Sequence, residues 1–497
     1  MHNAKLVPVD LPPGVKRAGT VYQTRGRWYD SSLVRWYEGS MRPWGGWASR
    51  TSTPMTGSCR AVLTWSANDT SRYIALGTHS KLYALTPSRT APVDITPAGF
   101  TAGRADAVQV GGYGSGLYGT GLYGAPRVST SGTVQDASMW TLDQFGQYMV
   151  GCMSDDGKIY EWQLDIAGPT AAAVVTNAPT SCQACVVTPE FFLVALGASG
   201  NPRNVAWSDQ AVETTWSAAA TNQAGSYIVQ TNGKLMCGKK IRGATLLFTN
   251  VDIHLMTYIG LPYVYSIQRI ADNCGAISRG CVATSDVHAF WMSMAGFFMF
   301  DGSSVQEMPC DVYEAVFSNI NMVQRSKIVA VPNTQFSEVI WFYPSSAATE
   351  NDSYVVYNYQ EQHWAVGSLV RLCGADRGVM ANPVMVDSGG TVYDHESGYA
   401  WGGATPYAES GPVEIGDGSH TMRLTSYITD ERTQGDTLLK FKMRDWPDMA
   451  ETTSASYAPA NPGNIRLSSR EFRLRVEFQG DGRWGSPRFG VIQGSRR

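Results

Sequence analysis

The chain has 497 residues, too many for one ordinary hydrophobic core, so its length predicts one large domain with smaller additions. Hydrophobic residues make up 43% and charged residues only 16%, which predicts a surface that meets other protein over much of its area. The sequence shows neither a secretion signal nor 18 consecutive apolar residues, so we expect no membrane span, and assembly in the cytoplasm.

The net charge of −3 is unevenly distributed along the chain. Residues 1–50 contain eight Lys and Arg against three Asp and Glu, residues 51–419 carry a net charge of −12, and residues 420–497 a net charge of +4. This pattern has two interpretations: ordinary surface variation, or basic ends that dock onto acidic partners while the middle repels polyanions. Residues 1–50 are predicted to form a docking arm that packs on the C-terminal domain or on a neighbouring chain.

Residues 51–404 are predicted to form a β-propeller of about seven degenerate blades. Short apolar runs dominate this region, and the best helical pattern, at residues 312–321, is short. A loose unit recurs: a strand of small apolar residues, a polar turn, and a strand with a central aromatic residue. Only ring closure buries the apolar faces of such blades, and a set of stacked β-sandwiches is the alternative. The units lie at residues 73–85, 148–162, 192–207, 245–256, 288–302, 339–358 and 384–393.

Two segments depart from this repeat. Residues 110–126 are rich in glycine, which cannot pack as a normal strand, so they are predicted to form a protruding loop between the first two blades. Residues 405–497 are predicted to form a separate small β domain. Within it, Glu471–Phe478 alternates apolar and charged residues, which is typical of a half-buried strand. The fold class is therefore all-β, a propeller with an additional C-terminal β domain.

The residues that carry chemistry are scattered. Asp252, Asp301 and Asp394 lie near corresponding strand ends and are candidates to line one mouth of the channel, but nothing in the sequence pairs them for glycoside hydrolysis. Cys182 and Cys185 form a lone CxxC pair, for which apolar packing is a better interpretation than a zinc site. Nucleophile-elbow and phosphate-loop motifs are absent from the sequence. We therefore expect no enzymatic activity, no cofactor and no metal.

Three stretches resemble one family of proteins. The first is RGRWYDSSLVRWYEGSMRPWGGW at residues 25–47, and the second is the tandem GLYG at residues 116–119 and 121–124. The third comprises RLRVE at residues 473–477 and GRWGSPRF at residues 482–489. Together they are similar to the opening, the loop and the ending of tail nozzle proteins of short-tailed bacteriophages, also called packaged-DNA stabilization or tail tubular proteins. The resemblance covers both ends and the first loop between blades.

The resemblance implies a structural protein of the virion tail. Its expected assembly is a homo-oligomeric ring, with six copies as the expected number, below the portal and adaptor proteins. This ring would extend the DNA channel, retain the packaged genome and support tail fibres or spikes. DNA would pass through the lumen without sequence-specific binding, and an acidic middle region would keep phosphates from sticking.

Aromatic and basic residues of the similar stretches are candidate contacts with other chains. For the four tryptophans near the start of the chain, packing in the core is an equally good interpretation. The candidates are Arg25, Arg27, Trp28, Arg35, Trp36, Trp44, Trp47, Tyr118, Tyr123, Arg473, Arg475 and Trp484.

Two other functions stay open at this point. One is a carbohydrate-binding or glycan-cleaving propeller of the tail, which would gather exposed carboxylates and aromatic residues at one mouth of the channel. The other is a fibre or spike adaptor that does not line the DNA channel.

Overall fold

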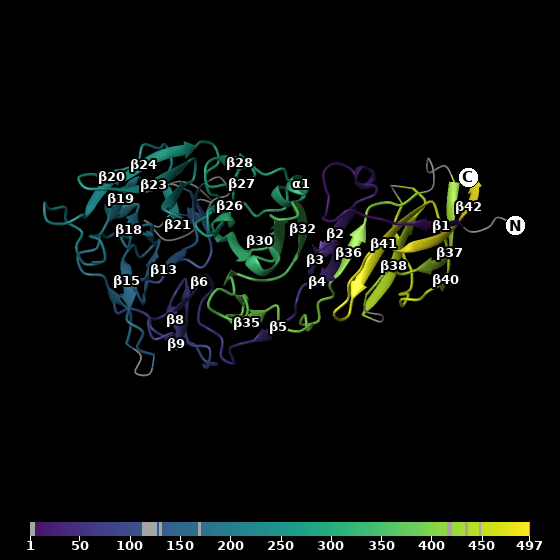
Figure 1. Cartoon of the computed structure of the whole chain (residues 1–497), viewed down its shortest axis with the longest axis horizontal. Coiled ribbons are helices and arrows are strands. Elements are labelled where there is room, and N and C mark those ends of the chain that lie inside the picture. The colour runs from purple at the N-terminus through teal and green to yellow at the C-terminus, as the bar shows by residue number, and fades with distance from the viewer. Residues whose placement is uncertain are drawn as a thin grey trace.

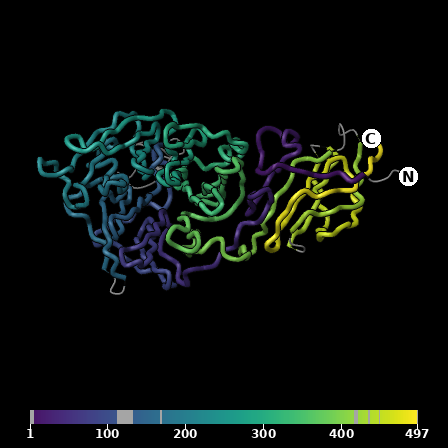
Figure 2. The backbone as a smooth tube through the Cα atoms, viewed as in Figure 1, coloured from purple at the N-terminus to yellow at the C-terminus, as the bar shows by residue number. Residues whose placement is uncertain are grey.

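The computed structural model shows two bodies arranged along one long axis, with both chain termini at the end of the smaller body (Figure 1). The backbone tube shows the N-terminal segment running along the smaller body before it enters the larger one (Figure 2). The structure describes residues 5–111, 127–128, 132–166, 170–414, 420–432, 436–446 and 449–496.

The larger body is a ring of seven four-stranded antiparallel sheets. Blade 1 contains β6 (Cys59–Ser66), β7 (Arg72–Thr78), β8 (Leu82–Leu85) and β9 (Val93–Asp94). Blade 2 contains β13 (Trp140–Phe145), β14 (Tyr148–Met153), β15 (Ile159–Trp162) and β16 (Ala173–Val174). Blade 3 contains β17 (Ala184–Val187), β18 (Leu193–Leu196), β19 (Asn204–Trp207) and β20 (Gly225–Ile228). Blade 4 contains β21 (Leu235–Ile241), β22 (Ala244–Thr249), β23 (Ile253–Gly260) and β24 (Val264–Ala271).

The last three blades complete the ring. Blade 5 contains β25 (Val282–Ser285), β26 (His288–Met292), β27 (Phe297–Phe300) and β28 (Val305–Glu307). Blade 6 contains β29 (Val329–Asn333), β30 (Glu338–Tyr343), β31 (Ser353–Asn358) and β32 (His363–Ser368). Blade 7 contains β33 (Cys373–Ala375), β34 (Val384–Val386) and β35 (Val392–His395), and its fourth strand is β5 (Trp47–Ser49) from the N-terminal segment. The first strand of each blade contacts the first strands of both neighbouring blades, so the ring is closed.

Packing between neighbouring blades explains why the strand pattern is apolar on both faces. In blade 6, all residues of β30 and β31 are buried, because each face of this sheet is covered by another part of the chain. The seven predicted units coincide with the two middle strands of the seven blades. The prediction of an all-β propeller with about seven blades is therefore confirmed.

The smaller body is a sandwich of two antiparallel sheets. One sheet has the order β1, β42, β37, β40, and the other has the order β2, β36, β41, β38, β39. The strands of the first are β1 (Lys5–Pro8), β42 (Arg488–Arg496), β37 (His420–Ile428) and β40 (Gly463–Ser469). Those of the second are β2 (Trp28–Ser32), β36 (Tyr407–Ser410), β41 (Glu471–Phe478), β38 (Thr437–Arg444) and β39 (Thr452–Thr453). An additional C-terminal β domain was also predicted, and this prediction is confirmed.

The N-terminal segment, residues 1–50, is divided between the two bodies. Strands β1 and β2 belong to the sandwich, whereas β5 pairs with β35 and closes blade 7. Between them lies a hairpin of β3 (Val34–Tyr37) and β4 (Ser40–Pro43), here named the junction hairpin. Of the two alternatives predicted for residues 1–50, packing on the C-terminal domain holds for β1 and β2, which pair with β42 and β36. Strand β5 differs from the prediction, because it pairs with β35 and so belongs to the propeller.

The remaining elements are short. A three-stranded sheet of β10 (Val108–Gly111), β11 (Arg127–Val128) and β12 (Thr133–Gln135) lies between blades 1 and 2. The glycine-rich loop predicted at residues 110–126 falls, from residue 112 onward, outside the described residues. The helical elements are α1 (Tyr313–Phe317), η1 (Val21–Thr24), η2 (Ala198–Gly200), η3 (Arg325–Lys327) and η4 (Thr334–Phe336). In the described part of the chain, none of the helices has the length and apolar character needed to cross a membrane.

Candidate functional site

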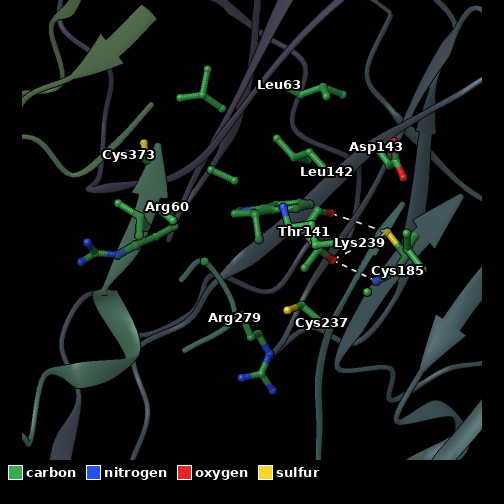
Figure 3. Close-up of a pocket in the computed structure, with 18 of the residues that line it drawn as sticks. Arg60, Leu63, Thr141, Leu142, Asp143, Cys185, Cys237, Lys239, Arg279 and Cys373 are labelled. Atoms are coloured by element: carbon green, nitrogen blue, oxygen red, sulfur yellow. Dashed lines mark hydrogen bonds between the residues drawn. The ribbon is translucent and has the colours of Figure 1, made fainter. Parts of the chain in front are cut away.

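The central channel of the propeller contains a cavity of about 270 Å³. Residues on or next to all seven inner strands line it, from Arg60–Leu63 on β6 to Cys373 and Gly374 on β33 (Figure 3). The inner strands meet the cavity largely with their edges, because their side chains pack against neighbouring blades. The cavity is therefore the axis of the ring and not a cleft between separate domains.

The charged side chains of Arg60, Asp143 and Lys240, which line the channel, are engaged by other groups of the chain. Arg60 forms a two-pronged ion pair with Glu350, at 2.7 and 2.8 Å, and Lys240 lies 2.7 Å from Asp143. In Figure 3 the guanidinium groups of Arg60 and Arg279 point away from Leu142 at the centre of the view. The channel thus has charged residues around it without a set of charges that converge on one point.

Arg279 is held in a different way from the ion-paired cations. Its Nε and Nη2 donate to the backbone and side-chain oxygens of Gln183, at 3.1 and 2.5 Å. Burial lowers the pKa of this guanidinium. The bond connects the segment before β25 with the segment before β17, so Arg279 ties blade 5 to blade 3 across blade 4.

One end of the channel is crossed by two connecting segments. Gln324, before blade 6, exchanges hydrogen bonds of 2.8 and 2.9 Å with the backbone of Ala107, before blade 2. In addition, Ser326 accepts a hydrogen bond of 3.1 Å from the backbone of Ala137. Blades 2 and 6 are as far apart as a ring of seven allows, so a direct contact between these segments must pass over the axis.

A buried lysine holds this crossing together. Lys327 is fully buried, and its Nζ lies 2.5 Å from Asp106, 3.3 Å from Glu350 and 2.7 Å from the backbone oxygen of Thr349. A buried ammonium needs such partners because desolvation otherwise favours its neutral form. Since Glu350 also holds Arg60, the closed end of the channel is one connected ionic network.

The thiols around the channel have low nucleophilic reactivity. Cys185, Cys237 and Cys373 line the cavity, and burial raises the pKa of Cys185 and Cys237 to about 12. A thiol with such a pKa is protonated at neutral pH and is a weak nucleophile. Among the described residues, no cluster of three or more metal-binding side chains is present, and Cys182 and Cys185 are both buried in apolar surroundings.

The three candidate carboxylates each interact with different neighbours. Asp252 is buried and accepts hydrogen bonds from Thr231 and Thr249, at 2.8 and 2.6 Å. Asp301 accepts backbone hydrogen bonds in its own turn, which lower the pKa of its carboxyl, and Asp394 is ion-paired with Arg50 at 2.7 Å. None of the three lines the central cavity. A paired acid and base for glycoside hydrolysis is not formed by these residues.

Six of the twelve candidate interface residues are buried within the chain. Trp28 packs on Trp36 and Trp44 stacks on Tyr354 of blade 6, with ring centroids 5.9 and 4.7 Å apart. For Trp28, Trp36 and Trp44, the structure supports the alternative interpretation, packing in the core, because blade 6 and the sandwich cover these side chains. The side chains buried in this way are Trp28, Arg35, Trp36, Trp44, Arg473 and Trp484.

The other candidates are partly exposed. Arg25 is ion-paired with Glu414 at 3.0 Å, Arg27 with Asp311 at 3.4 Å, and Trp47 stacks on His395. Tyr118 and Tyr123 lie outside the described residues.

The basic residues near the C-terminus are neutralised on their own sheet. Arg473 pairs with Glu409 at 2.9 Å, and Arg475 pairs with Glu477 at 2.7 Å while lying over the ring of Tyr407. Their charges are therefore compensated within the sandwich, and the docking of these residues onto acidic partners stays a prediction.

Sequence reasoning did not identify the most exposed apolar segment. Ile259, Leu261 and Tyr263 lie at the tip of the β23–β24 hairpin of blade 4, with Leu261 and Tyr263 exposed by 68% and 75%. Tyr227 and Ile228 on β20 of blade 3 are also exposed. The apolar run IGLPY contains a glycine and a proline, which predict a turn. Because a turn cannot bury every neighbouring side chain, this run was the signal for an exposed apolar segment.

Comparison with known proteins gives no information on activity, and the propeller is defined by the strand order of the chain itself. No protein-family model matches the sequence, and no curated protein matches it. A virginiamycin B lyase variant from Staphylococcus aureus, solved with quinupristin, is 6% identical, covering 69% of this chain and 97% of its own (TM-score 0.42). The Pan2 WD40 domain of Neurospora crassa is 8% identical, covering 70% and 94% (TM-score 0.39), and YCF48 from Cyanidioschyzon merolae is 9% identical, covering 71% and 98% (TM-score 0.30). These are β-propeller proteins, and at this level of similarity they indicate no activity.

Proposed function

We propose that this protein is a structural component of a virion, the nozzle ring at the tail of a short-tailed bacteriophage. The proposal combines the resemblance of residues 25–47 with the position of that segment in the fold. These residues contain β2, the junction hairpin and the start of β5, and they connect the sandwich to blades 6 and 7. The stretch that carries the resemblance is thus the stretch that joins the two bodies.

The hydrogen bonds across this junction are the observation that best supports the proposal. Ser31 Oγ donates to the backbone oxygen of Val366, at 2.7 Å, and Tyr354 accepts a hydrogen bond of 2.6 Å from the backbone of Leu33. On the other side, Met41 and Trp484 exchange two backbone hydrogen bonds of 2.8 and 3.0 Å. A subunit whose two bodies are tied in this way suits a ring that must withstand the pressure of packaged DNA.

In this proposal, the DNA channel lies between copies of the chain. The channel inside a single propeller is a cavity of about 270 Å³, and the Gln324–Ala107 contact crosses one of its ends. A duplex cannot pass through such a space, so the lumen is built from the outer surfaces of several subunits. The acidic excess of the propeller region would keep the phosphates of DNA from adhering to that lumen.

The proposed partners follow from the same assignment. They are further copies of this chain, with six as the expected number, the portal and adaptor proteins above the ring, and tail fibres or spikes at its side. The exposed tip of the β23–β24 hairpin, with Leu261 and Tyr263, is a surface suited to one of these contacts.

Virions produced without this chain are expected to package DNA and then lose it. Adding the purified protein to freshly filled particles should restore retention, measured as the fraction of encapsidated DNA that resists nuclease.

A variant with Leu261→Ser and Tyr263→Ser should bind particles less well if the hairpin tip makes a contact, whereas Val212→Ser on blade 3 is a matched exposed control. Full DNA retention in particles that lack the chain would contradict the proposal.

A further inference from the structure

The junction hairpin is anchored to the propeller by one arginine and two carboxylates. The Nε of Arg35 lies 3.1 Å from Glu338 at the start of β30, and its two Nη atoms lie 2.5 and 3.0 Å from Glu396, which follows β35. Arg35 also lies over the ring of Phe336, 3.7 Å from its centroid. A single guanidinium thus joins the N-terminal segment to blades 6 and 7 at once.

The charges in this cluster do not balance. Arg35 and Glu338 are each 2% exposed and Glu396 is 11% exposed, so two carboxylates share one buried guanidinium. The next cation is Arg42 on β4, which donates to Tyr37 and to the exposed Glu38. If both carboxyl groups were ionised, the two carboxylates and the guanidinium would together carry a net charge of −1 in a buried site, which is strongly unfavourable.

Two buried oxygen atoms in the cluster have no hydrogen-bond donor. They are Oε2 of Glu338 and Oδ1 of Asn333. These residues face each other across β29 and β30 in the strand register. The amide nitrogen of Asn333 already donates to Glu396, at 3.2 Å, so turning the amide over would bring its oxygen against that carboxylate. A hydrogen on Glu338 Oε2 is the atom that would satisfy both oxygens.

We propose that Glu338 is a proton-binding site, in which its protonated Oε2 donates a hydrogen bond to Oδ1 of Asn333 and secures the N-terminal segment to the propeller. Release of this proton leaves an unbalanced buried carboxylate and loosens the junction hairpin. Because β5 follows this hairpin and closes blade 7, the same proton strengthens the closure of the ring. The site belongs to a single chain and does not depend on assembly with other copies.

The electrostatic surroundings of Glu338 agree with this geometry. Burial raises the pKa of its carboxyl most, Arg35 lowers it, and Glu396 raises it further, with a resulting pKa of about 7. Arg42 lowers this pKa by a smaller amount. From β31, the residue opposite Glu338 is the uncharged Asn358. The proton is therefore exchanged in the neutral range.

The direction of the pH effect follows from the raised pKa. The carboxyl of Glu338 has a pKa near 4.5 in the unfolded chain and about 7 in the folded one, so folding binds a proton between these values. Its stabilising contribution is complete below about pH 4.5 and is lost as the pH rises through about 7. The buried histidines act in the opposite direction, because burial lowers the pKa of His363 and His395 and their contribution is lost as the pH falls.

The Glu338→Gln variant tests the proposal, because a glutamine mimics the protonated carboxyl at every pH. We expect equal melting temperatures for the variant and the wild type at pH 5.5, and a variant melting temperature higher by roughly 1–3 °C at pH 8. Glu307→Gln, on the exposed strand β28, is the matched control and should follow the wild type at both pH values. The hairpin amides at residues 34–42 should exchange hydrogen faster at pH 8 in the wild type than in Glu338→Gln, after correction for intrinsic rates.

A second variant decides the question if Glu338→Gln does not fold. Glu396→Gln removes the competing carboxylate, so Arg35 alone balances Glu338 and the fall in melting temperature between pH 6 and 8 should disappear. The proposal is overturned if the wild type, Glu338→Gln and Glu396→Gln show the same dependence of melting temperature on pH as Glu307→Gln.

Discussion

Deleting residues 1–49 is expected to prevent the chain from folding into a soluble protein. The deletion removes β5 from blade 7, β2 from the five-stranded sheet, β1 from the other sheet, and the whole junction hairpin. Tyr354 would lose the stacking contact with Trp44 that covers its ring, and the ring of blades would lose its closing strand. Size-exclusion chromatography and circular dichroism of the truncated protein measure the outcome.

A shorter deletion serves as the control for this experiment. Removing residues 1–9 takes away β1, whose four side chains are all exposed, and the half-buried Val9, and it leaves β2, the hairpin and β5 in place. This variant is expected to remain soluble, with a strand content close to that of the full chain. A monomeric, cooperatively unfolding protein that lacks residues 1–49 would show that the N-terminal strands are dispensable appendages.

Replacing Arg35 by methionine is expected to lower the free energy of unfolding by about 3–5 kcal/mol. The substitution keeps much of the length of the side chain, so packing on Phe336 is largely preserved. It leaves Glu338 and Glu396 buried without their common cation, and the uncompensated buried charge accounts for most of the loss of stability when a buried ion pair is broken. Urea denaturation followed by tryptophan fluorescence measures the change.

Arg242 provides the matched control for this substitution. It forms an ion pair with Asp286 in which the two side chains are 72% and 57% exposed, and solvent screens such pairs. Arg242→Met is expected to change the free energy of unfolding by less than about 1 kcal/mol. Equal effects of the two substitutions would mean that the Arg35 cluster does not anchor the hairpin.

The blades were predictable from the sequence because each contains a strong local signal. Two adjacent strands, such as β7 and β8 or β30 and β31, form an antiparallel hairpin of buried apolar residues separated by a polar turn. Such a pattern is visible within a short window of sequence and does not depend on distant partners. The repetition of the pattern then indicates a ring, because no single blade can bury its own faces.

The position of the N-terminal segment could not be predicted in the same way. Strand β5 is very short, and its partner β35 is the last strand of the propeller in chain order. A short apolar stretch looks the same whether it contacts another chain or a distant part of its own. The tryptophans of residues 28–44 were therefore equally compatible with an interface and with a core, and the structure places Trp28, Trp36 and Trp44 in the core.

Local charge counts were misleading for a similar reason. Arg473 and Arg475 contribute to a basic C-terminal segment, but their partners Glu409 and Glu477 lie beside them on β36 and β41 of one sheet. Net charge over a segment describes the field of an exposed surface only where the charges are not paired. Cross-strand pairing between segments that are distant in the sequence, such as that of Arg473 with Glu409, is not visible in a segment total.

Electron microscopy of virions labelled with an antibody against this chain tests the central claim most directly. The proposed function predicts label only at the tail, on a ring below the portal and adaptor proteins. Label on peripheral appendages, or virions that carry no label at all, would contradict a nozzle that encloses the DNA channel.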